Sequence, residues 1–132
     1  MDVLVDANAY LAVVLNEPEK QQIIDLTKGA ELISPEVLPY EIGNALTAMF
    51  KRKRLTIEQV RRCFNIFNVI PLRLESVDIF SALAIACEFN IYAYDAYYLS
   101  LAQQQNLPLL TLDNQMKDVA KLLNIKLLEV NV

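Results

Sequence analysis

The hydrophobic pattern alternates between short apolar runs and longer stretches in which apolar residues recur every three or four positions. Short runs are typical of buried strands, and periodic stretches are typical of helices with one buried face. Strands are predicted over residues 3–5, 31–34, 69–72, 107–112 and 126–130. Helices are predicted over residues 8–15, 18–28, 35–53, 56–68, 76–90, 95–102 and 116–123.

This order of elements predicts the fold. Because strands alternate with helices, we expect a three-layer αβα fold with a mostly parallel sheet of about five strands and helices on both faces. A hydrophobic content of 55% with only two glycines predicts one compact domain over residues 1–132. No apolar run approaches the roughly 18 residues of a membrane span. Cys63 and Cys87 lie in apolar helical stretches, so we expect buried, reduced thiols in a cytoplasmic protein without membrane association.

Acidic residues stand where the predicted strands and helices meet. Asp6 and Asp113 each directly follow a strand, and Asp95 begins a helix whose inward face includes Tyr98. Glu41 lies at the border of the apolar stripe of its helix, from which it can reach across the edge of the core. Because the carboxyl ends of parallel strands share one edge of a sheet, we expect these four acids to converge there.

Each acid also has an ordinary structural interpretation. Asp6 and Asn8 belong to residue types that cap helix N-termini, and a lone glutamate such as Glu41 is common at a core border. Asp95 is harder to explain this way, because an ionised carboxylate facing the core is costly unless it is capped, paired or bound to a metal. Single positions leave both interpretations open, and only the combination of four acids favours a site.

The residue types at this edge restrict the chemistry. Four carboxylates held together without a cation repel one another and raise each other's pKa. Carboxylate oxygens suit Mg²⁺, for which Mn²⁺ can substitute. The chain has no histidine, which excludes an imidazole base, a Ser-His-Asp triad and a histidine-ligated metal. A metal ion that activates water for attack on a phosphodiester remains, so we predict a metal-dependent phosphodiesterase.

A basic run is the second candidate site. Lys51, Arg52, Lys53 and Arg54 stand at the end of the helix that carries Glu41, in a chain whose net charge is −4. Cations at a helix C-terminus are favourable with the macrodipole, so a solvated helix end explains the run. A patch that binds substrate phosphates explains it equally well, and the sequence leaves both open.

Four motifs resemble those of a known family. They are Val3-Leu-Val-Asp-Ala-Asn8, Tyr40-Glu-Ile-Gly-Asn44, Tyr94-Asp-Ala-Tyr-Tyr98 and Leu110-Thr-Leu-Asp113. The chain resembles the PIN-domain nucleases, most closely the VapC-type toxin ribonucleases of toxin–antitoxin pairs, over residues 3–130. The resemblance implies a PIN-like fold, Mg²⁺-dependent endoribonuclease activity on RNA, a homodimer and a small inhibitory antitoxin.

The resemblance also implies roles for particular residues. Its acidic catalytic quartet falls on Asp6, Glu41, Asp95 and Asp113. Within that quartet, we expect Asp6, Asp95 and Asp113 to hold the metal. Asn8 stands where the family often has Ser or Thr, and Asn44 is a polar neighbour of Glu41; we expect both to support the acids. Tyr92 and Tyr94 stand where the family often has Ser or Thr before the third acid.

Other classes match the sequence less well. A haloacid-dehalogenase-type phosphatase needs a second acid at the position of Asn8, and a receiver domain needs an adjacent acid pair and a late lysine. The alternative from another class is a catalytically silent PIN-like module that binds RNA or protein, although such a module has no need of four mutually repelling acids. For the homodimer, we expect an exposed apolar ridge of Tyr97 and Leu101.

Overall fold

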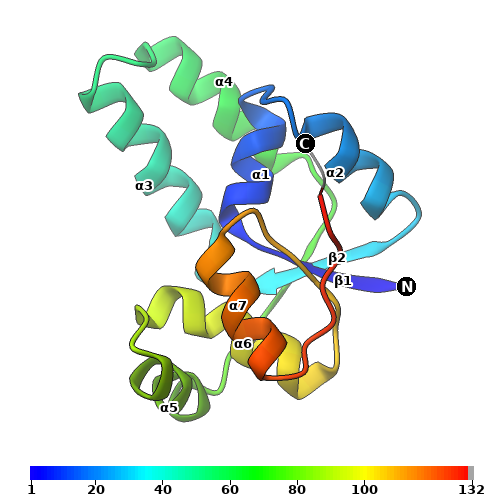
Figure 1. Cartoon of the computed structure of the whole chain (residues 1–132). Helices are drawn as coiled ribbons and strands as arrows, with labels where there is room; N and C mark the ends of the chain where they lie inside the picture. Colours follow the sequence, from blue (N-terminus) through cyan, green and yellow to red (C-terminus); the bar gives the residue numbers. More distant parts are fainter. Residues whose placement is uncertain (131–132) are drawn as a thin grey trace.

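The computed structural model describes residues 1–130, in which the strands form one parallel sheet (Figure 1). The strands are β1 (Asp2–Val5), β2 (Glu31–Pro35), β3 (Arg73–Glu75) and β4 (Leu109–Leu110). Their order is β3-β2-β1-β4, and each neighbouring pair is parallel. The three apolar side chains of the central strand β1 are at most 2% exposed, as expected for a strand covered on both faces.

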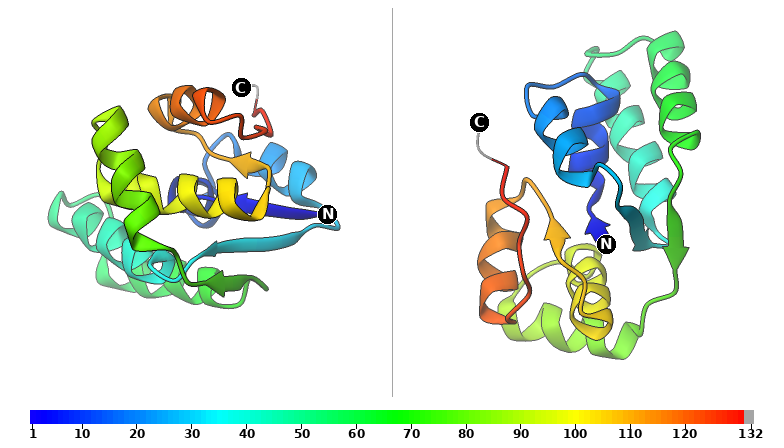
Figure 2. Two further views of the ribbon diagram at one scale, coloured as in Figure 1. Left: turned by 90° about the horizontal axis from the view of Figure 1, so that it is seen from below. Right: turned by 90° about the vertical axis from the view of Figure 1, so that its right-hand side faces the viewer.

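The helices form two layers around this sheet. They are α1 (Ala7–Val14), α2 (Lys20–Thr27), α3 (Leu38–Lys51), α4 (Ile57–Asn68), α5 (Ile79–Phe89), α6 (Ala93–Gln105) and α7 (Asn114–Leu122). In the right-hand view of Figure 2, α1 to α4 lie on one side of the sheet and α5 to α7 on the other. The αβα prediction is confirmed, with four strands among residues 1–130 where about five were expected.

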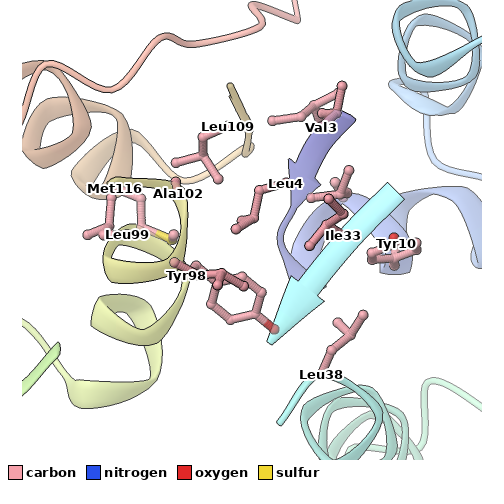
Figure 3. Packing of buried hydrophobic residues seen from close by; sticks show 14 of the residues in the cluster. Val3, Leu4, Tyr10, Ile33, Leu38, Tyr98, Leu99, Ala102, Leu109 and Met116 are labelled. Carbon is pink, nitrogen blue, oxygen red and sulfur yellow. The ribbon is translucent and has the colours of Figure 1, made fainter. Parts of the chain in front are cut away.

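The core is continuous through the sheet. Figure 3 shows Leu99 and Ala102 of α6 on one side of β1 and Tyr10 of α1 on the other. The Tyr10 ring meets the ring of Phe67 in α4 edge to face, with 5.5 Å between centroids. Because both faces of β1 are packed in this way, the residue that follows β1 is held in a fixed position at the carboxyl edge of the sheet.

The edge strand predicted over residues 69–72 is wrong. The backbone N–H groups of Val69 and Ile70 donate to carbonyls at the end of α4, so these residues continue its last turn. Pro71 has no N–H to offer a sheet, and β3 begins two residues later at Arg73.

The strand predicted over residues 126–130 is reduced to one bridge, between Leu109 and Leu127. Two backbone hydrogen bonds accompany it, from Leu109 N–H to Lys126 and from Leu128 N–H to Leu109. The partner strand β4 spans only two residues, so it offers no longer ladder for this segment to join.

The helix boundaries follow local chemistry. A capping box begins α4, since the Thr56 hydroxyl accepts from Gln59 N–H at 3.2 Å and Gln59 Oε1 accepts from Thr56 N–H at 2.8 Å. Helix α3 begins three residues later than predicted, because Pro35 belongs to β2. Helix α5 also begins later, where the Asp78 side chain caps it.

Two surface predictions are corrected. Cys63 is buried as expected, but Cys87 is exposed on α5. The ridge of Tyr97 and Leu101 is not exposed: Leu101 is 1% exposed and Tyr97 is partly buried, because α6 packs against α5, α7 and the sheet. Among residues 1–130, none of the helices is long and apolar enough to cross a membrane.

Candidate acidic site

Asp6 connects the central strand to the first helix. Its side chain is 3% exposed and caps α1, with Oδ1 accepting from Ala9 N–H at 3.0 Å. The capping interpretation is therefore correct, but it does not explain the burial. Burial, together with the charges of Asp113 and Asp95, raises the pKa of Asp6 to about 6, although the hydrogen bonds from Thr111 and Ala9 lower it.

Thr111 joins two of the acids. Its hydroxyl, which is fully buried, donates to Asp6 Oδ2 and accepts from Asp113 N–H at 3.0 Å. One side chain thereby fixes the end of β1 relative to the segment that leads into α7. With bonds on both oxygens, the Asp6 carboxylate is held in one orientation.

Glu41 reaches the same region from the first turn of α3. The buried Tyr98 hydroxyl of α6 donates to Glu41 Oε1 at 2.8 Å. Burial, together with the charges of Asp95 and Asp6, raises the pKa of Glu41 to about 6, although the hydrogen bond from Tyr98 lowers it. The predicted reach of Glu41 across the edge of the core is present in the structure.

Asp95 and Asp113 stand at the beginnings of α6 and α7. Burial, and then the charge of Asp113, raises the pKa of Asp95. Asp113 caps α7, with its Oδ1 accepting from Gln115 and Met116 N–H at 2.8 and 3.2 Å. Each of the other three acids has its pKa raised by at least one member of the group, so the four carboxylates surround a common region.

The acids fit a hard cation by their chemistry more than by their present positions. Among residues 1–130, no group of three or more His, Cys, Asp or Glu side chains is arranged closely enough to hold a metal ion. The donors are nevertheless oxygens, and their mutual repulsion is what a bound divalent ion removes. Asp6 is held by two hydrogen bonds and Glu41 by one, whereas the partly buried Asp95 side chain forms none within residues 1–130.

The predicted supporting residues lie at an open cavity beside Glu41. Asn8 of α1 and Asn44 of α3 are both exposed and both line this cavity of about 390 Å³. Among residues 1–130, neither side-chain amide forms a hydrogen bond to an acid, so the structure shows no direct support of the acids by either residue.

The basic run lies far from the acids. Lys51, Arg52, Lys53 and Arg54 are all exposed where α3 turns into α4, the end that projects away from the sheet in Figure 1. At about 1.5 Å per helical residue, this end lies about 16 Å along α3 from Glu41. The run could contact substrate only if that substrate extends along α3.

Thr111 and Tyr98 are site residues that the sequence analysis did not identify as such. Thr111 is a polar residue inside the run Leu109–Leu112, two positions before Asp113, and that interruption was the available signal. Tyr98 was assigned to the inward face of its helix, but its partner Glu41 is 57 residues away, and no local pattern indicates that pairing.

Comparison with known proteins identifies the family. A family model described as PIN domain matches residues 3–122. The chain belongs to the PIN domain family. Ribonuclease VapC9 of Mycobacterium tuberculosis (strain ATCC 25618 / H37Rv) is 30% identical over 120 residues, which cover 90% of this chain and 91% of that protein. Ribonuclease VapC3 of Pyrobaculum aerophilum is 26% identical over 123 residues, covering 89% and 94%.

Solved structures of PIN proteins share the fold. PAE2754 from Pyrobaculum aerophilum superposes with a TM-score of 0.71 at 24% identity, covering 94% of this chain and 95% of that chain. VapBC2 from Rickettsia felis, solved with a DNA fragment from its promoter, gives a TM-score of 0.68 at 18% identity, covering 99% and 100%.

Proposed function

We propose that this PIN domain is a metal-dependent endoribonuclease of the VapC type, the toxin of a toxin–antitoxin pair. The observation that carries the proposal is the buried Asp6 carboxylate, coupled electrostatically to acids from three other elements at the carboxyl edge of the sheet. An arrangement that raises acid pKa values is costly for a structural role and suits a metal-assisted reaction. The similarity to VapC ribonucleases supports RNA as the substrate.

Asp6, Asp95 and Asp113 would hold Mg²⁺, or Mn²⁺ in its place. A divalent ion there supplies an acidified water and positive charge beside the scissile phosphodiester. The contribution of Asp6 is rigidity, because its two hydrogen bonds keep a ligand oxygen in place before any ion arrives. Asp95, at the first turn of a helix, is the ligand with freedom to adjust.

Glu41 is suited to accept a proton. Tyr98 occupies Oε1, while Oε2 accepts no hydrogen bond from any residue in the range 1–130. With a pKa of about 6, the carboxylate is mostly ionised at neutral pH yet more basic than an ordinary glutamate. We assign Oε2 of Glu41 as the base that takes the proton of the attacking water, with Tyr98 orienting the carboxylate.

A homodimer would form through α5 in place of the ridge predicted on α6. Ile79, Phe80 and Leu83 are 56%, 87% and 42% exposed, and no charged residue occurs from position 79 to 87. An apolar face without charge offers nothing to select a partner of opposite charge, and it suits pairing with its own copy about a two-fold axis. The antitoxin is proposed from the fold shared with VapBC complexes.

Cleavage of single-stranded RNA by the purified chain tests this proposal. We expect cleavage in Mg²⁺, none in EDTA, and none from Asp6→Asn or Asp95→Asn under either condition. The matched control is Asp78→Asn, which alters an exposed helix cap far from the acids in sequence and should cleave normally. Cleavage by Asp95→Asn at the wild-type rate would refute the site, and RNA binding without any cleavage would favour the silent module.

A further inference from the structure

Apart from Glu41, the residues that line the cavity beside the acids have no part in the proposed cleavage chemistry. Helices α1, α3 and α6 border this open cavity of about 390 Å³, and the apolar part of its lining consists of Ala7, Leu11, Val37 and Ala45. Tyr40 and Tyr94 stand at this cavity with 78% and 56% of their surfaces exposed. The Tyr94 ring is braced by an edge-to-face contact with Tyr97, at 6.0 Å between centroids.

The polar groups of the cavity are mostly neutral. Its lining includes two amides, Asn8 and Asn44, and one carboxylate, Glu41, but no lysine or arginine. A phosphate or an acidic side chain would therefore meet a negative charge with no cation to balance it. A flat, neutral group with both donors and acceptors at its rim matches two tyrosine faces and two amides.

We propose that this cavity binds one unpaired nucleobase of the RNA and reads its identity. This inference rests on the proposed function, since it names the part of the substrate that lies beside the cleaved bond. The tyrosines provide faces on which a base stacks, a contact that tolerates any base. The amides of Asn8 and Asn44 provide a donor and an acceptor each, which is how side chains distinguish one base edge from another.

The position of the cavity relative to the acids supports this assignment. Tyr94 immediately precedes Asp95, and Tyr40 immediately precedes Glu41, so each tyrosine is adjacent in the chain to an acid of the site. A base held between α1, α3 and α6 would leave its own phosphate near the carboxylates. The RNA must be single-stranded there, because a paired base cannot enter a cavity between helices.

An arginine side chain is the other flat group that this cavity could accept, because it stacks on aromatic rings and pairs with a carboxylate. Arginine, however, only donates hydrogen bonds. It could pair with the two amide oxygens, but it would leave both amide NH₂ groups without an acceptor. A nucleobase uses both. The lining therefore favours the base, and the two occupants predict different results in one titration.

The experiment is a titration of the ¹⁵N-labelled full chain with adenosine, guanosine, cytidine and uridine, without metal. These nucleosides are uncharged, so the acids do not repel them, and the side-chain NH₂ signals of asparagine report binding directly. We expect saturable shifts of the Asn8 and Asn44 signals, with one nucleoside binding more tightly than the others. Tyr94→Ala should weaken that binding about fivefold or more through lost stacking.

Two matched variants separate stacking from general damage. Tyr94→Phe keeps the ring and should bind like the wild type. Tyr92→Ala removes a tyrosine that is 84% exposed but does not line the cavity, and it should also bind normally. Asn44→Ala should reduce the preference among the four nucleosides while its folding, on an exposed helical position, is unaffected.

The inference is overturned if no nucleoside shifts the Asn8 and Asn44 signals, or if Tyr94→Ala binds as tightly as the wild type. Shifts caused by arginine amide but by no nucleoside would also overturn it, in favour of a peptide side chain. Because no metal or cleavage is involved, nucleoside binding by a chain that never cuts RNA would refute the proposed function alone. Cleavage without nucleoside binding would refute the cavity assignment alone.

Discussion

Replacing Asp6 with asparagine should stabilise the metal-free protein at neutral pH while abolishing its activity. Asparagine keeps an oxygen that can accept the Ala9 N–H bond, so the cap of α1 survives. The Thr111 hydroxyl, which now donates to Asp6, can accept from the new amide. The substitution removes the negative charge of a side chain that is 3% exposed and is repelled by Asp113 and Asp95.

The size of the effect follows from the pKa of Asp6, which burial raises from 3.8 to about 6. At about 1.4 kcal/mol per pKa unit, the ionised carboxylate lowers the free energy of unfolding by about 3 kcal/mol above pH 6. The folded state binds this proton more tightly than the unfolded state, so wild-type stability falls as pH rises from about 4 to about 6. Asparagine carries no such proton, so the gain should be full at pH 7 and absent near pH 4.

Thermal unfolding in EDTA at pH 4, 5, 6 and 7 measures this difference. For a chain of 132 residues, about 3 kcal/mol corresponds to a rise in Tm of about 10 °C at pH 7. Glu41 titrates in the same range, and loss of the Asp6 charge removes one cause of its raised pKa, so the difference between variant and wild type measures Asp6 together with its coupling to Glu41. The control is Asp78→Asn, an exposed cap whose hydrogen bonds with Ser81 lower the pKa of its carboxyl, so its loss should destabilise slightly at pH 7.

A particular result would refute this reasoning. If Asp6→Asn lowers Tm by the same amount at every pH, the carboxylate is an ordinary helix cap whose burial costs nothing. The functional interpretation of its raised pKa would then lose its basis. Equal Tm values for variant and wild type at pH 7 would have the same consequence.

Three further predictions concern the cation, the basic run and the dimer. Mg²⁺ should raise the Tm of the wild type progressively with concentration and have no effect on Asp6→Asn, measured by the same thermal scans; a wild-type Tm that ignores Mg²⁺ would contradict a metal site. If the basic run binds phosphates, the double variant Lys51→Ala and Lys53→Ala should reduce the slope of log affinity against log salt by about 1.4 for single-stranded RNA. An unchanged slope would mean that the run is only a solvated helix end. Sedimentation should give twice the 15.0 kDa chain mass, and Phe80→Asp should halve it, whereas a wild-type monomer would exclude the dimer.

The position of Asp6 could be predicted from the sequence, because local order determines it. The apolar run at residues 3–5 had to be buried, and the change to helical periodicity after it required a capping residue at that edge of the sheet. Asp6 therefore could be placed from ten residues. Its two interpretations, cap and site acid, looked like alternatives, but the structure shows that Asp6 is both a cap and a buried, charge-coupled acid.

The sequence could not predict contacts that depend on how many faces of a helix are covered. Periodicity assigned α6 one inward face and left Leu101 outside, yet α6 lies between the sheet, α5 and α7, so Leu101 is buried. The hydrogen bond of Tyr98 to Glu41 and that of Thr111 to Asp6 are equally non-local. Both cross from one element to another, and a pattern within a single element contains no information about its partner.

The way the acids are held supports the proposed cation site at this edge of the sheet. Both hydrogen bonds to the Asp113 side chain end on Oδ1, so Oδ2 is available to a ligand. In Glu41 the hydrogen bond ends on Oε1, so Oε2 is available in the same way. Asp6 and Asp113 cap helices, and the positive end of a helix dipole favours a carboxylate there. For Asp6 that help is insufficient, since burial still raises its pKa to about 6. The helices thus fix the oxygens of these two acids without neutralising their charge, and under the proposed function a bound divalent ion would relieve the repulsion that remains.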